Sequence, residues 1–339
     1  MNARVRVSVA LPVYNELEVL PELLERVRAV LRAIPGGPHQ IVFADDGSRD
    51  GSFEYLEHAA LADSKLVVVR LARNFGHQMA LTAAIDHADG DVVILMDSDL
   101  QDAPEAIPLF LEKYAEGYDV VYAQRERRKE NAVLRACYFL FYRLIARLSR
   151  VDLPVDAGDF SLLSRRVVDV MRRSPERHRY LRGLRAWAGF RQIGVPVERA
   201  ARTKGESKYT FRRLLTLAFD GVFSFSVVPL RAAATVGMAA VFASCLFAVY
   251  SIVAKVLFDR SPEGFTALIV ALTFLSGMQL IFLGLLGEYV GRIFEEVKRR
   301  PLYVVDRLVS PTGDTRARDT GVGDTRSFAP PGAYELHEA

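Results

Sequence analysis

The chain has 339 residues, a formal net charge of +3, and hydrophobic side chains at 50% of its positions. Its two cysteines are too few for a disulfide framework or a cysteine-rich zinc site. The basic residues cluster at 125–129, 199–213 and 298–300, beside apolar stretches, which favours phosphates or a membrane surface over a DNA groove. No signal-peptide pattern opens the chain, so we expect its catalytic part in the cytoplasm.

The first 125 residues alternate strand and helix patterns. We predict strands at 5–13, 41–44, 66–71, 91–96 and 120–123, and helices at 16–33, 52–60, 79–87 and 106–115. Apolar strands separated by helices are typical of a Rossmann-like, mostly parallel α/β sheet. A short strand at 160–163 and a helix at 165–172 follow. The aromatic amphipathic stretches at 134–148 and 211–229 could lie on a bilayer or cover the sheet.

Two segments without any charged residue, 232–254 and 265–287, follow these elements. Each has about 23 residues, and about 20 suffice to span a bilayer as a helix. A pair of buried helices in a soluble core is the alternative, which two adjacent uncharged runs of this length disfavour. Basic residues flank the outer ends of the pair, so the positive-inside rule places both termini in the cytoplasm.

These patterns divide the chain into five parts. The last part, the tail from residue 310, is expected to be disordered because Gly, Pro, Thr, Asp and Arg dominate it and apolar residues are few. The parts are a cytoplasmic catalytic domain (1–210), a juxtamembrane amphipathic helix (211–231), a transmembrane hairpin (232–291, with helices at about 232–256 and 265–289), a cytoplasmic basic segment (292–309) and the tail (310–339).

The most informative stretch is the apolar run at 91–96, which ends in the acidic loop Asp97–Asp102. Carboxylates at the C-terminal end of a parallel strand lie where open α/β sheets bind ligands. Asp97 and Asp99 can offer hard oxygen ligands to one Mg²⁺ or Mn²⁺, a type of ion that commonly also binds substrate phosphates. Gln101 adds a neutral oxygen. Taken alone, this stretch fits a solvated acidic turn equally well.

Two other strand ends carry polar residues. Pro12 fixes the exit of the first strand, Tyr14 and Glu16 could hold a base or ribose, and Asn15 is expected to cap the helix starting at Glu16. The second strand ends in another acidic loop, residues 45–52. Because parallel strands end at one edge of a sheet, we expect both acidic loops to border a single crevice.

Further along, polar residues again follow apolar runs. Asp159 follows Gly158, whose backbone freedom permits an unusual turn, although a plain turn is the alternative. Arg125 follows the fifth strand, and Arg135 lies in the next amphipathic stretch. The Gly-centred basic loop at 202–209 precedes the membrane segment, and this position favours a lipid-linked phosphate as its ligand over simple solvation.

Five motifs occur in order along the chain: Leu11-Pro-Val-Tyr-Asn-Glu16, Asp45-Asp-Gly-Ser48, Arg73-Asn-Phe-Gly-His77, Met96-Asp-Ser-Asp-Leu-Gln-Asp102 and Lys204-Gly-Glu-Ser-Lys-Tyr209. Together they resemble the family-2 glycosyltransferases that load sugars onto polyprenyl phosphate. Dolichyl-phosphate mannose synthases and bactoprenol glucosyltransferases belong to that group. The resemblance covers roughly residues 5–300, including the two C-terminal apolar helices of the bactoprenol type.

This resemblance implies a GT-A fold, a nucleotide-sugar donor such as UDP-glucose, and Mg²⁺ or Mn²⁺ as cofactor. It also implies roles by motif position: Pro12, Tyr14, Glu16 and Asp46 for the nucleoside; Asp97, Asp99 and Gln101 for the metal and donor diphosphate; Asp159 beside sugar and acceptor; and Arg125, Arg135, Arg202, Ser207 and Lys208 for donor or acceptor phosphates.

The implied reaction is inverting attack of a polyprenyl phosphate oxygen on the anomeric carbon. The metal would neutralise the leaving diphosphate, so Asp99 counts as catalytic. Because the nucleophile is already an anion, a general base is dispensable, and we assign Asp159 to orientation first and base catalysis second. The expected setting is the cytoplasmic face of a bacterial inner membrane, with the bilayer as a partner, nucleic acid excluded, and a dimer or tetramer favoured by helix packing.

Three alternatives stay open from the sequence. The donor could be GDP-mannose or a modified UDP-sugar, because one hydroxyl's orientation leaves no sequence signature. A processive polysaccharide synthase usually carries Gln-x-x-Arg-Trp, a pattern that residues 184–187 lack. A non-catalytic membrane scaffold would have no use for Asp46, Asp97 and Asp99.

Overall fold

The computed structural model describes residues 5–125, 157–174, 176–177, 179–197, 228–258, 264–310 and 313–316. These residues fall into two compact units. The first unit contains the sheet and its covering helices, including the described residues from 300 onward. The second contains two long apolar helices, and each unit is described by itself.

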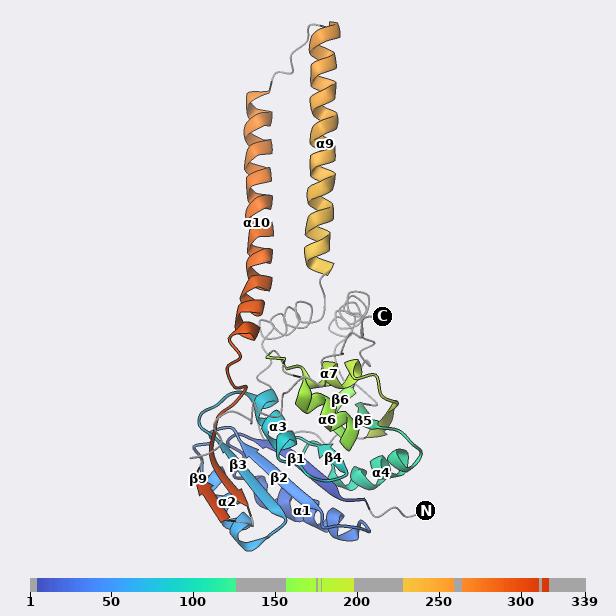
Figure 1. Ribbon diagram of the computed structural model, residues 1–339, viewed down its shortest axis with the longest axis vertical. Helices are drawn as coiled ribbons and strands as arrows, with labels where there is room; N and C mark the ends of the chain where they lie inside the picture. The colour runs from blue at the N-terminus through green and yellow to red at the C-terminus, as the bar shows by residue number, and fades with distance from the viewer. Residues whose placement is uncertain are drawn as a thin grey trace, which may run out of the picture. The chain divides into compact units, whose positions relative to one another are not determined.

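The first unit is built on a nine-stranded sheet with the order β7-β5-β6-β4-β1-β2-β3-β8-β9 (Figure 1). Parallel pairing joins β1 to β2, β1 to β4, and β2 to β3, while β6 runs antiparallel between β4 and β5. The predicted α/β class with a mostly parallel centre is confirmed. The strands are β1 (Val7–Val13), β2 (Gln40–Asp45), β3 (Leu66–Leu71), β4 (Val92–Leu95), β5 (Val120–Arg125), β6 (Ala157–Ser164), β7 (Gln192–Val197), β8 (Val305–Ser310) and β9 (Gly313–Arg316).

Helices cover both faces of this sheet and bury two apolar clusters. On one face α1, α2 and α4 pack on the side chains of Val7, Val9 and Leu11, and on the other face α3, α6 and α7 pack on Ala10 and Val93. The alternation of side chains along a strand divides the core in this way. The helices are α1 (Leu20–Ala33), α2 (Ser52–Ala62), α3 (His77–Asp86), the 3₁₀ turn η1 (Pro104–Ala106), α4 (Ile107–Ala115), α6 (Arg165–Arg173) and α7 (Leu181–Trp187).

Four elements of this unit were not predicted: α7, β7, β8 and β9. The strand β7 contains a glycine and a proline, which weaken its signal, and it lies at the sheet edge where a proline is tolerated. The strands β8 and β9 form a hairpin, with β8 antiparallel to β3. The structure therefore differs from the expectation that the chain loses order after about residue 310, because this hairpin covers the otherwise open edge of β3.

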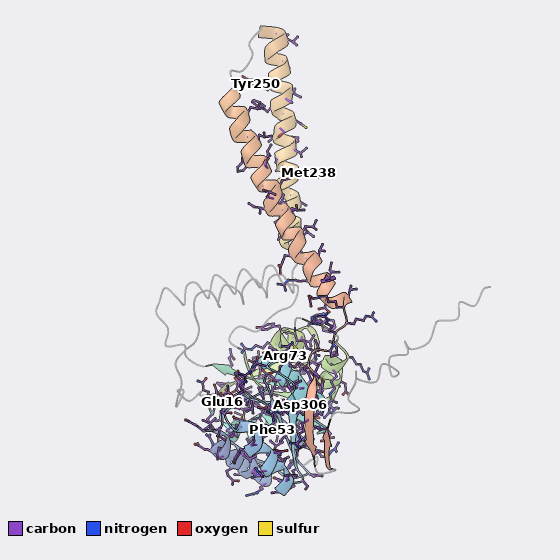
Figure 2. All side chains as sticks on the ribbon, turned by 90° about the vertical axis from the view of Figure 1, so that its left-hand side faces the viewer. Glu16, Phe53, Arg73, Met238, Tyr250 and Asp306 are labelled. Atoms are coloured by element: carbon purple, nitrogen blue, oxygen red, sulfur yellow. The ribbon has the colours of Figure 1, made fainter. Side chains whose placement is uncertain are left out.

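The second unit contains α9 (Val228–Phe258) and α10 (Phe265–Val297), which lie alongside each other (Figure 1). Both are long and apolar enough to cross a membrane, over Ala232–Tyr250 and Phe274–Val297, and neither stretch is buried within the protein. Large apolar side chains project outward, with Met238 72% and Tyr250 64% exposed (Figure 2). The predicted spans at 232–256 and 265–289 fall within these helices, and a bilayer would cover their apolar surface.

Candidate active site

Of the predicted site residues, those at or just after the ends of β1, β2 and β4 lie at one end of the sheet because these three parallel strands share a direction. Val13, the last residue of β1, pairs with Asp45, the last residue of β2. Leu95 at the end of β4 pairs with Ser161 in antiparallel β6. Continuing this register by two residues brings Asp159 opposite Asp97. The expected crevice edge is therefore formed by the ends of β1, β2 and β4 and the start of β6.

The loop after β1 is fastened to the loop after β2 by hydrogen bonds. The backbone N–H of Asn15 donates to Ser48 Oγ at 2.9 Å, and Asn15 Oδ1 accepts from the N–H of Arg49 at 2.9 Å. The prediction that Asn15 caps a helix starting at Glu16 is wrong, because α1 begins at Leu20. Asn15 instead has a positive φ of 55°, a conformation that asparagine tolerates, and joins the two loops.

Of the residues expected at the nucleoside, Tyr14 presents the most surface, with 47% of it exposed. Glu16 is half-buried and Pro12 is buried. The Pro12 carbonyl accepts a hydrogen bond from Ser98 Oγ at 2.8 Å, which anchors the Asp97 loop to the end of β1. The three residues thus lie at the predicted edge, and their contact with a nucleoside stays a prediction.

Asp46 organises a third loop, residues 73–77. Its carboxylate accepts from the backbone N–H groups of Phe75 at 2.7 Å and Gly76 at 2.9 Å, while only 2% of the residue is exposed. Burial raises the pKa of Asp46, and these hydrogen bonds oppose that rise. The carboxylate therefore holds protein backbone, and its expected contact with the nucleoside stays a prediction.

The 73–77 loop delivers His77 to the acidic loop after β4. His77, the first residue of α3, has Nε2 3.0 Å from Asp97 Oδ1. Burial opposes protonation of His77, but the hydrogen bond and charge of Asp97 raise its pKa above the ordinary value. Sequence reasoning recognised the motif that ends in His77 but gave the residue no role.

The acidic loop itself offers oxygen ligands of the kind that Mg²⁺ and Mn²⁺ prefer. Asp99 Oδ1 accepts from the N–H of Gln101 at 3.1 Å across Leu100, whose φ is +59°. Within the described residues, no group of three or more His, Cys, Asp or Glu side chains is arranged to hold a metal. The assignment of Asp97, Asp99 and Gln101 to a metal therefore stays a prediction, which the chemistry of these oxygen donors fits.

Asp159 forms a bidentate ion pair that the sequence did not predict. Arg182 Nε lies 2.6 Å from Asp159 Oδ1, and Arg182 Nη2 lies 2.6 Å from Oδ2. Burial raises the pKa of Asp159, but the hydrogen bonds and charge of Arg182 outweigh this effect and lower it. The sequence signal was a run of arginines spaced three residues apart, which includes Arg182 and Arg185.

The second of these arginines, Arg185, is buried, with 3% of its surface exposed. Its Nε and Nη2 find no hydrogen-bond partner in the described part of the chain, and its guanidinium lies 5.0 Å from the Tyr122 ring centre. Burial lowers the pKa of Arg185 to about 10, so it stays a cation at neutral pH. A buried cation beside Asp159 adds positive potential to this end of the site.

The remaining predicted residues are less fully described. Arg125 is the last residue of β5, paired with Val197, and its backbone lies at the same edge because β5 is parallel to β4. Its side chain lies outside the description. Arg135, Arg202, Ser207 and Lys208 lie outside the described residues, as do the amphipathic stretches at 134–148 and 211–227, so their roles stay predictions.

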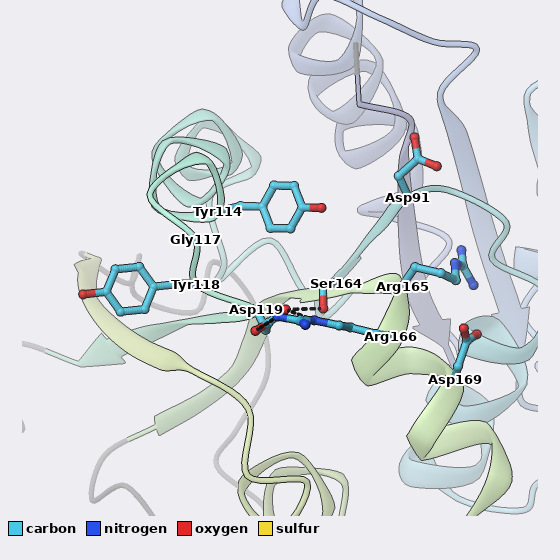
Figure 3. A pocket seen from close by; sticks show the side chains of 9 residues that line it. All are labelled: Asp91, Tyr114, Gly117, Tyr118, Asp119, Ser164, Arg165, Arg166 and Asp169. Carbon is cyan, nitrogen blue, oxygen red and sulfur yellow. Dashed lines mark hydrogen bonds and ion pairs between the residues drawn. The ribbon is translucent and has the colours of Figure 1, made fainter. Parts of the chain in front are cut away.

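A cavity of about 540 Å³, whose lining includes Asp91, Asp119 and Arg166, lies at the opposite ends of the strands from the acidic loops (Figure 3). Asp91 precedes β4 there, and Asp119 precedes β5. Arg166 binds Asp119 through Nε and Nη2, each 2.5 Å from a carboxylate oxygen. This pair has the same bidentate form as the Arg182–Asp159 pair but lies at the start of β5, at the opposite ends of the strands from the acidic loops.

The mostly parallel sheet, with acidic loops after β2 and β4, defines a GT-A-like α/β enzyme. The chain belongs to glycosyl transferase family 2: that family's model matches residues 8–172, and the model described as the GtrB C-terminal hairpin matches residues 228–293. The hairpin match and the two exposed apolar helices identify a membrane-associated glycosyltransferase.

Relatives match along most of the chain. The uncharacterized glycosyltransferase YkcC of Bacillus subtilis is 39% identical over 308 residues, 91% of this chain and 95% of the relative. The SfII prophage-derived bactoprenol glucosyl transferase of Shigella flexneri is 38% identical over 303 residues, 89% of this chain and 98% of the relative. Among solved structures, the mannosyltransferase PcManGT from Pyrobaculum calidifontis, in complex with GDP-Man and Mn²⁺, has a TM-score of 0.46 and 18% identity, covering 88% of this chain and 87% of that chain.

Proposed function

We propose that the protein transfers glucose from UDP-glucose to polyprenyl phosphate, with inversion at the anomeric carbon. The observation that carries this proposal is the 38% identity to a bactoprenol glucosyl transferase, which extends over 303 residues. A match of that length includes the sheet with its acidic loops as well as the apolar hairpin. Both halves are needed for a water-soluble donor to meet a membrane-bound acceptor.

The donor would bind across the loops after β1, β2 and β4. We assign the nucleoside to Pro12, Tyr14, Glu16 and Asp46, and assign Mg²⁺ or Mn²⁺ with the diphosphate to Asp97, Asp99 and Gln101. The oxygen-rich acidic loop and its anchoring to β1 support this assignment. When bound, the cation would neutralise the charge that develops on the leaving diphosphate.

The acceptor would approach with its phosphate, an anion at neutral pH, as the nucleophile. We assign donor or acceptor phosphates to Arg125, Arg135, Arg202, Ser207 and Lys208, and place Asp159 beside the sugar and acceptor. Two polyanionic substrates repel each other, so cationic side chains are required between them. The apolar hairpin would hold the catalytic unit at the cytoplasmic face of a bacterial inner membrane, with both termini in the cytoplasm. Apolar helices that pack between copies would favour a dimer or tetramer.

The reaction can be tested on the full chain purified in detergent. Undecaprenyl phosphate is offered with radiolabelled UDP-glucose, UDP-galactose or GDP-mannose, and the lipid product is separated by thin-layer chromatography. We expect a single-sugar lipid from UDP-glucose, lost with EDTA and restored by Mg²⁺ or Mn²⁺. A polymeric product would indicate a processive synthase, a preference for GDP-mannose would overturn the donor assignment, and absence of turnover would support a scaffold.

Single variants separate the metal and acceptor assignments. Asp99→Ala should abolish transfer, whereas the control Asp91→Ala, at the opposite end of β4, should retain it. Near-normal turnover by Asp99→Ala with added Mg²⁺ or Mn²⁺ would exclude the metal role. Lys208→Ala should weaken use of the lipid phosphate far more than nucleotide binding, and equal losses would mean that its loop has another role.

A further inference from the structure

Asp159 is largely shielded from a substrate. Both of its carboxylate oxygens accept a hydrogen bond from Arg182, and only 12% of its side chain is exposed. Arg182 differs in both respects. Its side chain is 32% exposed, and a guanidinium carries five N–H donors, of which this pair uses two. The more accessible member of the pair is therefore the arginine, and the pair leaves three of its N–H donors unused.

We propose that Arg182 binds a phosphoryl group of the reacting substrates and that Asp159 is its positioning residue rather than a general base. This inference rests on the proposed function, because phosphate is a substrate group only in that reaction. A carboxylate that fixes one edge of a guanidinium leaves its other edge pre-organised for a second planar or tetrahedral anion. The phosphate could belong to the polyprenyl acceptor or to the donor diphosphate.

Other charged side chains lie around the pair. From α7, the buried Arg185 faces Asp159, and from α3, His77 faces it. His77 is itself hydrogen-bonded to Asp97, whose carboxylate the proposed metal would share. Arg182 and Arg185 together balance the charges of Asp159 and Asp97, so phosphate would be drawn by the directed N–H donors of Arg182 and not by a net charge. The depressed pKa of Asp159 also makes its carboxylate a weak proton acceptor.

A purely structural ion pair would fix α7 to β6 and do nothing more. The chain supplies a matched example in Arg166 and Asp119, which have the same bidentate geometry beside the cavity at the opposite sheet edge (Figure 3). Arg166→Ala is therefore the control for loss of a bidentate arginine away from the acidic loops. Any effect specific to Arg182 should exceed the effect of this control.

The experiment uses full-length protein in detergent, with kcat and KM measured separately for undecaprenyl phosphate and UDP-glucose, and Kd measured for UDP. Arg182→Ala should lower kcat/KM by roughly 10- to 100-fold, the size expected for lost hydrogen bonds to a charged group. Arg182→Lys, which keeps the charge but not the fork, should fall between wild type and Arg182→Ala, and Arg166→Ala should change little. A higher KM for undecaprenyl phosphate with unchanged UDP affinity would identify the acceptor phosphate. Weaker UDP binding would identify the donor.

A double-mutant cycle tests whether Asp159 acts through Arg182. Adding Asp159→Asn to Arg182→Ala should lower kcat/KM by less than about threefold further. The plot of kcat/KM against pH for Asp159→Asn alone should keep the same fall at acid pH as the wild type. The proposal would be overturned if the two substitutions lowered kcat/KM by factors that multiply in the double variant. It would also be overturned if the fall in kcat/KM at acid pH disappeared in Asp159→Asn, because Asp159 would then act as a base. Unchanged kinetics and UDP affinity in Arg182→Ala or Arg182→Lys would overturn it as well. If the wild-type protein itself lacks transfer while UDP binding persists, the proposed function fails.

Discussion

Gly47, in the loop after β2, packs closely against the backbone of the 73–77 loop. It has a φ of +74°, and a Cβ built there would lie 3.0 Å from the Arg73 carbonyl carbon and 3.1 Å from the Asn74 nitrogen. Gly117 also has a positive φ, +89°, but the nearest atom to its Cβ would be Arg191 Nη1 at 3.6 Å. Gly117→Ala therefore carries the backbone strain of Gly47→Ala without its clash.

The structure sets the size of the difference. Left-handed backbone costs an alanine about 1–2 kcal/mol at either site. Overpacking against fixed backbone adds about 1–3 kcal/mol at Gly47 alone. Gly47→Ala should thus cost roughly 2–5 kcal/mol, against about 1–2 kcal/mol for Gly117→Ala. At roughly 2–4 °C per kcal/mol for a domain of this size, the two melting temperatures should differ by roughly 2–12 °C.

The assay is thermal unfolding of both variants in the same detergent, followed by initial transfer rates well below either melting temperature. Gly47→Ala should also lose transfer, because a displaced 73–77 loop moves His77 away from Asp97. Gly117→Ala should transfer normally. Equal melting temperatures for the two variants would refute the claim that the two loops are packed in backbone contact.

Three further outcomes follow from the hydrogen bonds described above. Asp46→Asn keeps one oxygen acceptor for the partly buried N–H groups of Phe75 and Gly76. Thermal unfolding should therefore show a free energy of unfolding lower by about 1–3 kcal/mol. Tyr303→Phe removes the O–H that Asp86 accepts at 2.8 Å, and should cost a similar amount by the same measurement. The hydrogen bond from Arg166 lowers the pKa of Asp119 from its ordinary value of 3.8. The stability that this ion pair adds to the folded state is therefore complete above pH 3.8 and is lost as the pH falls through the pKa of Asp119 in the folded state. Arg166→Ala should therefore make the melting temperature less sensitive to acid below about pH 4, as a pH series of melts would show.

The sequence located the central sheet because each buried strand is an apolar run that stops at polar residues. Asp97 could be placed at a strand end from such a run alone, whereas Asp159, expected just before a strand at 160–163, lies inside β6 because that strand begins at Ala157. What each side chain contacts could not be predicted in the same way. Asn15 looked like a helix cap because a polar residue preceded a helical pattern, but the chain makes one more turn before α1, and its amide binds the neighbouring loop instead.

Long-range partners were missed for a related reason. Arg182 lies 23 residues from Asp159, and only the packing of α7 against the sheet decides that they meet. The strand β8 follows a membrane-type helix and belongs to a sheet that begins almost 300 residues earlier, so no local periodicity links it to β3. Its own residues, Val-Asp-Arg-Leu-Val-Ser over Val305–Ser310, show no strict alternation of apolar and polar side chains.

Helix α3 connects the segment after α10 to the acidic loop through a hydrogen bond at each of its ends. Tyr303 donates to Asp86 at the C-terminal end of α3, and the N-terminal residue of the same helix is His77, which binds Asp97. A helix of ten residues is about 15 Å long and moves as one body. Asp86 is half-buried, desolvation raises its pKa, and Arg172 lies 3.9 Å away, so we expect the loss of its Tyr303 partner to shift the end of α3. The stability lost in Tyr303→Phe should therefore be accompanied by lost transfer, which a purely local packing defect would leave intact.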